Sequence, residues 1–165
     1  MKGFLLVITF IVLVGTLQAQ SPGKTFGFGL IVGDPTGGTI KLWTGGTNAI
    51  AAHVGGSYFG EIRIGADYLW HFNAFNSRMF NLHAGVGGAI GLGDGGGPLH
   101  DANSDNFYNR GDDAGVGIGG RGVVGVNFYT PGAPVEIFLE VGPFIGIVPD
   151  VGFAFDGALG ARYYP

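Results

Sequence analysis

The sequence predicts an all-β fold in which eight antiparallel strands close into an up-and-down barrel. After residue 25, apolar side chains alternate with polar or small ones, the period-two pattern of strands whose two faces meet different environments. Short segments rich in Gly, Pro, Asn and Asp separate the alternating runs and are typical of tight turns. Because closing the sheet removes its unpaired edges, a barrel is the architecture that these strands favour.

The composition supports one folded domain and excludes several classes of protein. The 165 residues include 35 Gly and no Cys, 46% are hydrophobic, and only 12% are charged. A chain with this apolar content has far more to bury than a disordered one, and its glycines follow no collagen period. The lack of Cys removes disulfide frameworks, zinc ribbons, thiol nucleophiles and lipoprotein anchors. With 8 Lys and Arg and a net charge of −4, the chain is not expected to bind nucleic acid.

Residues 1–19 have the parts of a secretory signal peptide. Lys2 precedes an apolar run over residues 4–14, and Ala19 supplies a small residue for cleavage. The run is shorter than the about 20 residues that a membrane-spanning helix needs. We therefore expect cleavage after Ala19, which leaves a mature barrel domain of residues 20–165. The alternative is an uncleaved anchor or a buried N-terminal helix.

The alternation defines the expected strands. It is clearest over residues 61–72, where one phase is apolar and the other carries every charge. The connections are short except for residues 93–114, a polar segment with five acids, and a loop of this length is commonly functional or disordered. The eight expected strands are residues 26–32, 39–43, 49–58, 61–72, 79–92, 116–128, 135–142 and 151–163.

Either phase of such a barrel can face outward, and the composition of the polar phase decides between the two arrangements. In a soluble carrier of the lipocalin kind the polar phase meets water, whereas in a membrane-spanning barrel it fills the interior. Here that phase is largely Gly and Ala, which suit a narrow interior better than a solvated surface. It also carries four cations and five anions, and buried charges need partners. The expected interior ion-pair network is Lys41, Glu61, Arg63, Asp67, Arg121, Glu136, Glu140, Asp156 and Arg162.

The aromatic residues and the long connection agree with a transmembrane barrel. Aromatic side chains of the apolar phase gather toward strand ends, where interfacial girdles lie in membrane barrels. Taken singly, each is better interpreted as an ordinary core aromatic, and it is the set together that favours the lipid-facing interpretation. If both termini are periplasmic, the fifth connection, residues 93–114, is extracellular, as long loops of such barrels are. The expected interface aromatics are Tyr58, Trp70, Phe72, Phe128 and Tyr163.

The chain resembles the small outer-membrane β-barrel proteins of Gram-negative bacteria, of the OmpX or OmpA-transmembrane size. More narrowly, it is similar to an uncharacterised family with an early Gly-Asp-Pro-Thr-Gly turn (33–37), a central Ala-Asp-Tyr-Leu-Trp-His strand (66–71), a late Phe-Leu-Glu-Val-Gly-Pro strand (138–143) and a Gly-Ala-Arg-Tyr-Tyr end (160–164). The last alternating strand resembles the signal read by the barrel-insertion machinery, although Tyr164 and Pro165 follow its aromatic Tyr163. The resemblance implies fold and location, and it implies no established activity.

Two further motifs resemble known binding sites, and each has a simpler interpretation. The glycines of residues 115–120 match the sequence pattern of a dinucleotide-binding motif, but the segment continues into an expected strand rather than a helix. Asp101, Asn103, Asp105 and Asp112 imitate the ligand spacing of a calcium loop. Asn106 stands where that loop needs Gly, and Asp112 replaces the bidentate Glu, so a solvated loop is the preferred interpretation and Ca²⁺ the alternative.

The sequence favours a non-enzymatic role. A lipid-modifying barrel needs catalytic groups on its lipid side, and the apolar phase contains neither Ser nor His. His53 and Ser57 share the other phase but lie about 13 Å apart along one strand, at about 3.3 Å per residue. We therefore expect a monomeric outer-membrane barrel, without cofactor, that has a structural or surface-interaction role and meets an extracellular partner through residues 93–114. A narrow channel and a soluble, lipocalin-like carrier of an apolar ligand are the alternatives.

Overall fold

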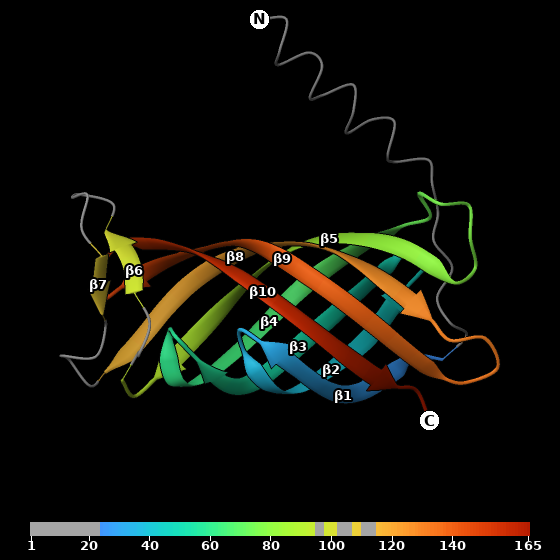
Figure 1. Cartoon of the computed structure of the whole chain (residues 1–165), viewed down its shortest axis with the longest axis horizontal. Helices are drawn as coiled ribbons and strands as arrows, with labels where there is room; N and C mark the ends of the chain where they lie inside the picture. The colour runs from blue at the N-terminus through green and yellow to red at the C-terminus, as the bar shows by residue number, and fades with distance from the viewer. Residues whose placement is uncertain (1–23, 95–97, 102–106, 110–114) are drawn as a thin grey trace, which may run out of the picture.

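The strands form a single antiparallel sheet that closes on itself. The computed structural model describes residues 24–94, 98–101, 107–109 and 115–165. Figure 1 shows the strands inclined to the long axis of the molecule. Their bounds are β1 Phe26–Gly33, β2 Thr36–Gly45, β3 Asn48–Ser57, β4 Gly60–Phe72, β5 Phe80–Leu92, β6 Pro98–Asp101, β7 Phe107–Asn109, β8 Val116–Tyr129, β9 Val135–Val148 and β10 Gly152–Tyr163.

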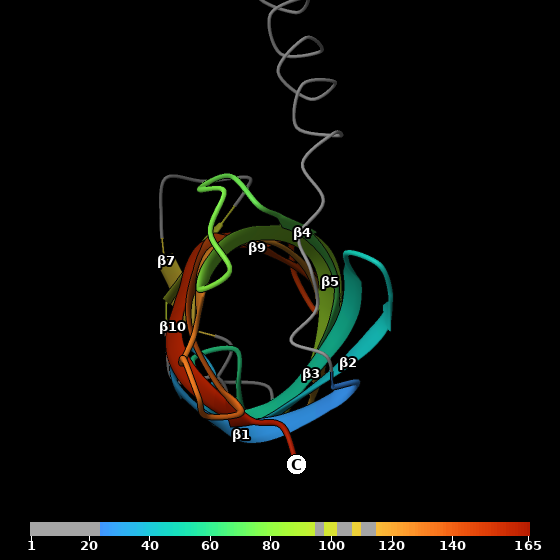
Figure 2. The same cartoon turned by 90° about the vertical axis from the view of Figure 1, so that its right-hand side faces the viewer.

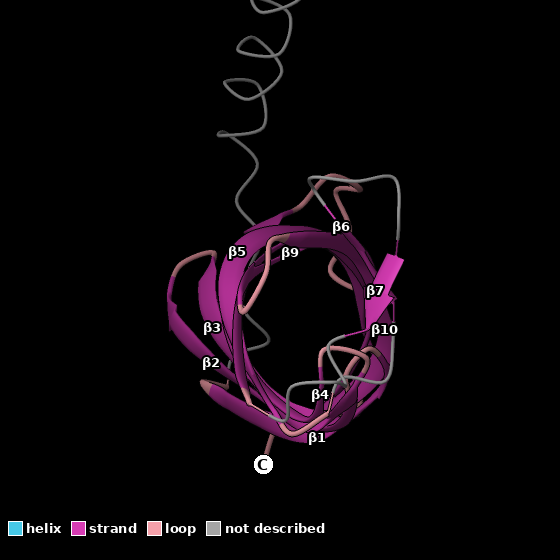
Figure 3. Cartoon of the chain, turned by 90° about the vertical axis from the view of Figure 1, so that its left-hand side faces the viewer, coloured by secondary structure: helices cyan, strands magenta, loops and turns pink. Residues whose placement is uncertain are grey.

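Eight of these strands make the barrel, and each pairs with its neighbours in chain order. The order is β1-β2-β3-β4-β5-β8-β9-β10, and β1 pairs with β10 to close the ring. The two end-on views show the closed ring (Figures 2 and 3). The expected eight-stranded, antiparallel, up-and-down barrel is therefore confirmed. Within the described residues there is no helix long and apolar enough to cross a membrane.

The two ends of the barrel differ. We call the end that holds Lys24, Tyr163 and the turns β2–β3, β4–β5 and β8–β9 the terminus end, and the opposite one the hairpin end (Figure 1). Strands β6 and β7 lie at the hairpin end and pair with each other. This short hairpin occupies the segment for which the sequence predicts only a polar loop.

The β6–β7 hairpin pairs with the part of the β10 edge that β1 leaves unpaired. Strand β1 pairs with β10 only from Ala158 to Tyr163, so the first residues of β10 extend beyond β1. Strand β6 pairs with these residues through Asp101 opposite Gly152 and His100 opposite Phe153. Unpaired strand edges recruit other strands, and this one is covered from within the same chain.

Strand β9 is longer than the sequence predicts and continues through Pro143 to Val148. A proline lacks the N–H that a central strand needs, and it is tolerated where pairing is interrupted. The β8–β9 pairing passes from Arg121 opposite Phe144 to Val124 opposite Val141, with no ladder pair between them. Pro143 lies at this interruption.

Burial alternates along every barrel strand. In β4, Arg63, Asp67 and His71 are buried inside the barrel, while Ile62 and Ile64 are exposed on the outer face. Exposed apolar side chains cover the outer face, up to Leu30 at 71% exposed. The polar phase therefore faces inward and the apolar phase outward, the reverse of a soluble protein.

Glycines give the interior the room that its long charged side chains need. At Gly142, a Cβ atom would lie 1.9 Å from the carbonyl oxygen of Gly122, on the neighbouring strand. At Gly157, on the outer face, the nearest atom to a Cβ would be Val141 Cγ1 at 3.8 Å. These two glycines therefore form a matched pair for a test of interior packing.

We expect Gly142→Ala to lower the free energy of unfolding by about 1–3 kcal/mol, because the added methyl group displaces backbone. Gly157→Ala should change it by less than about 0.5 kcal/mol. Urea titration of the two variants measures the difference. Equal effects of the two substitutions would contradict the close approach of β8 and β9.

Candidate functional site

The barrel interior holds a network of buried ion pairs. Of the nine charged residues that the sequence assigns to the interior, eight are no more than 5% exposed. They come from five of the eight barrel strands, β2, β4, β8, β9 and β10, so the network ties opposite walls together. These eight are Lys41, Arg63, Asp67, Arg121, Glu136, Glu140, Asp156 and Arg162.

At the hairpin end, Arg63 binds two carboxylates. Its Nη1 lies 3.0 Å from Asp34 Oδ1, and its Nη2 lies 2.7 Å from Asp156 Oδ2. Asp34 belongs to the β1–β2 turn and also accepts hydrogen bonds from Ser57 Oγ, at 2.5 Å, and from the backbone N–H of Tyr58, at 3.0 Å. Burial raises the pKa of Asp34 above its ordinary value, although these hydrogen bonds and Arg63 lower it. Asp34 thus joins two turns and Arg63, a role that the turn motif did not reveal.

Tyr58 corrects one sequence prediction. We expected it among the interface aromatics, but its hydroxyl donates a 2.5 Å hydrogen bond to Asp156 Oδ1 inside the barrel. Burial and the neighbouring charge of Asp156 raise the pKa of the Tyr58 phenol, so the hydroxyl stays protonated as a donor. The reason for the error is local: Tyr58 follows the last residue of β3, in the turn to β4, where strand alternation no longer applies.

In the middle of the barrel, Arg121 connects three acids. Its Nη2 lies 3.0 Å from Glu140 Oε1, its Nε 3.4 Å from Asp67 Oδ1, and its Nη1 3.8 Å from Asp156 Oδ2. Asp156 also binds Arg63, so the hairpin-end and central groups form one continuous network. Two histidines border it, with His53 Nδ1 3.8 Å from Asp67 Oδ2 and His83 Nε2 3.7 Å from Glu140 Oε2.

Toward the terminus end, Glu136 is the common acceptor. Lys41 Nζ lies 2.7 Å from its Oε1, and neither side chain is exposed. The Tyr164 hydroxyl donates to Glu136 Oε2, and Arg162 Nη1 lies 3.8 Å from Oε1. Burial and the charge of Glu136 raise the pKa of the Tyr164 phenol, which keeps it a hydrogen-bond donor. Tyr164, which the sequence treats as a departure from the terminal strand signal, is thus part of the interior.

Aromatic clusters close the polar network at both ends. At the hairpin end, the rings of Phe59 and Phe144 lie 4.5 Å apart, and Tyr58 packs on them. At the terminus end, Trp43 and Tyr164 form a buried cluster with Ala49. Two cations of the network also stack on these rings. Arg63 lies 4.4 Å from the centroid of the Phe144 ring, and Lys41 lies 4.5 Å from that of the Trp43 ring. The interior is therefore packed rather than hollow at its ends.

The other four expected interface aromatics belong to the outer phase. Trp70 and Tyr163 are exposed, and Phe72 and Phe128 are half-buried. All four lie toward the terminus end, where Phe128 packs 4.9 Å from Phe80 and Tyr163 lies 6.0 Å from Phe28. Aromatic side chains of β1, β4, β5, β8 and β10 thus form a band over part of the outer face near the terminus end.

Glu61 corrects a second sequence prediction. It has the phase of Arg63, but its side chain is exposed rather than part of the interior network. It is the second residue of β4, immediately after the irregular β3–β4 pairing at Ser57, so it lies at the barrel rim. Asp34, from the turn, supplies the fifth acid of the interior instead.

Several sequence predictions fall on residues that the structure does not describe. The expected signal peptide, residues 1–19, lies outside the described residues. So do Asn103, Asp105 and Asp112 of the calcium-like motif, while Asp101 ends β6. Among the described residues, no three His, Asp or Glu side chains are grouped to hold a metal ion.

Among the described residues, Ser57 and His53, which share one strand and one phase, do not pair with each other. The Ser57 hydroxyl donates to Asp34, whereas His53 faces Asp67, so these two side chains meet different acids. What the geometry does provide is mutual neutralisation of buried charge. Comparison of the chain with protein-family models, with curated proteins and with solved structures found no match.

Removing the central cation tests the network. Arg121→Leu leaves Asp67 and Glu140 buried with their main cation missing, and we expect a loss of about 3–5 kcal/mol in the free energy of unfolding. Glu61→Gln, at the rim, should change it by less than about 0.5 kcal/mol. Urea titration measures both. A value near zero for Arg121→Leu would mean that water already solvates these carboxylates.

Proposed function

We propose that this protein is exported and inserted in the outer membrane of a Gram-negative-type bacterium, as a monomeric transmembrane barrel with a structural or surface-interaction role. The observation that carries the proposal is the distribution of polarity. Apolar side chains are exposed around the whole outer face, and eight charged side chains of the barrel strands are paired inside. Such an outer face is stable in a lipid environment.

The size of the exposed apolar face supports a lipid environment around the barrel. Soluble monomers rarely expose contiguous apolar patches larger than a few hundred Å². Here every barrel strand contributes exposed Leu, Ile, Val or aromatic side chains to the outer face. The barrel strands are 8–14 residues long, and a tilted membrane strand needs about 9–11.

The aromatic residues support two membrane boundaries. One band, with Tyr68, Trp70, Phe128 and Tyr163, lies toward the terminus end. At the hairpin end, Phe153 and Phe155 lie 5.1 Å apart on the outer face of β10. Aromatic girdles at the two interfaces flank the apolar band of membrane barrels.

The connections support an orientation. Strand β1 begins and strand β10 ends at the terminus end, and the longest connection lies at the hairpin end (Figure 1). Short turns face the periplasm in outer-membrane barrels, and longer loops face outside. Residues 93–114, with the β6–β7 hairpin, would then be extracellular, which favours a role in contact with a partner outside the cell. The N-terminal segment would direct export, and the barrel-insertion machinery would place the chain.

The two alternatives fit the interior less well. A lipocalin-like carrier needs an apolar cavity, whereas the described interior is crossed by ion pairs such as Lys41–Glu136 and Arg63–Asp156. A channel needs an open path, whereas aromatic clusters close both ends of the network. Steady conductance in a planar bilayer would favour the channel instead.

Cell fractionation tests the membrane assignment. We expect the protein to remain in the outer-membrane fraction, to need detergent for extraction, and to change its gel mobility on heating. A native protein that stays dispersed in buffer without any amphiphile would contradict the proposal and favour the soluble carrier.

A charge placed on the outer face refines this test. Val141, at the centre of β9, is 50% exposed, and Val151 precedes β10 at the hairpin end. In lipid vesicles, Val141→Arg should cost about 2–4 kcal/mol of folding free energy, and Val151→Arg about 0–1 kcal/mol. Urea titrations in vesicles measure both. A face that meets water would tolerate the two substitutions equally.

The orientation is tested separately with epitope tags. A tag inserted after Asn103 should be labelled by antibody on intact cells. A tag inserted after Gly132, in the β8–β9 turn, should be labelled only after the outer membrane is made permeable. The reverse result would place the hairpin end in the periplasm and would remove the basis for an extracellular partner.

A further inference from the structure

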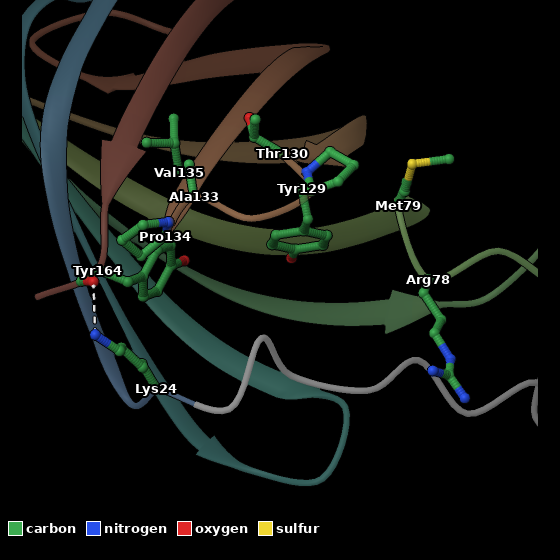
Figure 4. A pocket seen from close by; sticks show the side chains of 10 residues that line it. Lys24, Arg78, Met79, Tyr129, Thr130, Ala133, Pro134, Val135 and Tyr164 are labelled. Carbon is green, nitrogen blue, oxygen red and sulfur yellow. Dashed lines mark hydrogen bonds between the residues drawn. The ribbon is translucent and has the colours of Figure 1, made fainter.

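A pocket of about 370 Å³ opens at the terminus end, beside the aromatic cluster that closes the barrel. Its lining comes from the start of the barrel domain, from the β4–β5 turn, from the β8–β9 turn and from the last residues of the chain. Figure 4 shows Lys24 beside Tyr164 on one side of it and Arg78 beside Met79 on the other, with the ring of Tyr129 between the two sides. Binding pockets for small molecules have volumes upward of about 300 Å³, so the pocket is large enough for a small ligand.

The pocket carries positive charge and no negative charge. Lys24 and Arg78 are the two charged residues that line it. Neither forms an ion pair with an acid among the described residues, where every ion pair joins an interior Lys, Arg or His to an Asp or Glu. Lys24 Nζ lies 3.3 Å from the backbone oxygen of Tyr164, which positions it at the pocket. An ammonium has three donors, so Lys24 keeps donors for a ligand.

Apart from Thr130, the remaining wall of the pocket is mainly apolar. Met79, Pro134 and Val135 line it together with the rings of Tyr129 and Tyr164. The Tyr164 hydroxyl is directed away, to Glu136 in the interior. The ring therefore presents carbon to the pocket, and a ligand held there meets cations at the sides and an apolar floor.

We propose that this pocket binds a small amphiphilic anion, a phosphate or carboxylate joined to a short apolar body. The anionic group pairs with Lys24 and Arg78, and the apolar body packs on the tyrosine rings and Pro134. The same chemistry belongs to a free organic anion and to the headgroup region of an anionic phospholipid. The proposal stands on the pocket alone and does not require the membrane assignment.

Amide chemical shifts of the full mature chain test the proposal with two probes. Phenyl phosphate, titrated in zwitterionic micelles, represents the free anion, and nanodiscs with or without phosphatidylglycerol represent the lipid. We expect saturable shifts at Tyr129, Ala133 and Val135 with at least one probe. A response to phenyl phosphate identifies a free anion as the ligand source, and a response only to phosphatidylglycerol identifies the lipid headgroup.

Variants separate charge from shape. Lys24→Gln and Arg78→Gln should each weaken binding by about tenfold or more, since each removes a charge-assisted contact. Arg78→Lys keeps the charge and should retain most of the affinity. Ala133→Phe fills the pocket without changing its charge and should abolish binding. Unchanged shifts elsewhere in the barrel show that each variant is folded.

Two results would overturn the proposal. One is the absence of saturable shifts at these amides with both probes. The other is binding that survives both Ala133→Phe and the loss of the two cations. The phenyl phosphate titration gives its answer even if the barrel proves soluble in plain buffer, so its failure is distinguishable from failure of the membrane assignment.

Discussion

The pairing of buried charge in the interior is the constraint on which the rest of this barrel depends. An ionised side chain inside a barrel is costly unless an opposite charge meets it. Arg63 and Arg121 share Asp156, and through Asp34, Asp67 and Glu140 they join strands from opposite walls. Because Arg121 has acceptors on β4, β9 and β10, and Arg63 has them on β10 and in the β1–β2 turn, the network holds the ring closed in one register.

The glycines and the outer face follow from this constraint. Long charged side chains fill the narrow interior only where their neighbours are small, as at Gly87, whose absent side chain leaves room for Asp67. With polar groups inside, the apolar phase must face outward, since strand side chains alternate. The exposed face of Leu139, Val141 and Ile145 is thus the counterpart of the buried Glu140 and Phe144 on the same strand.

Strand alternation predicts what repeats along a strand and fails where the strand ends. It identifies all eight barrel strands and eight interior charges, because a period of two carries through each strand. It misplaces Tyr58 and Glu61 because one lies in a turn and the other at a rim. It misses Asp34 because a Gly-Asp-Pro turn has the same sequence whether or not its carboxylate meets a distant arginine. The β6–β7 hairpin depends on an unpaired edge of β10, which is a property of the closed ring and not of the local sequence.

The ends of the barrel carry opposite charge, and this polarity links the interior to the pocket. At the hairpin end and in the middle of the barrel, Arg63 and Arg121 face four acids, and the exposed Glu61, Asp94 and Asp150 add negative charge at the hairpin end. Toward the terminus end, Lys41 and Arg162 share the single acid Glu136, and Lys24 and Arg78 lie outside. An anion approaching the barrel is therefore repelled at one end and attracted at the other. The pocket lies at the attractive end, where Tyr164 contacts the pocket with its ring and Glu136 with its hydroxyl. An anion in the pocket therefore supplies negative charge near the cations that Glu136 alone does not neutralise.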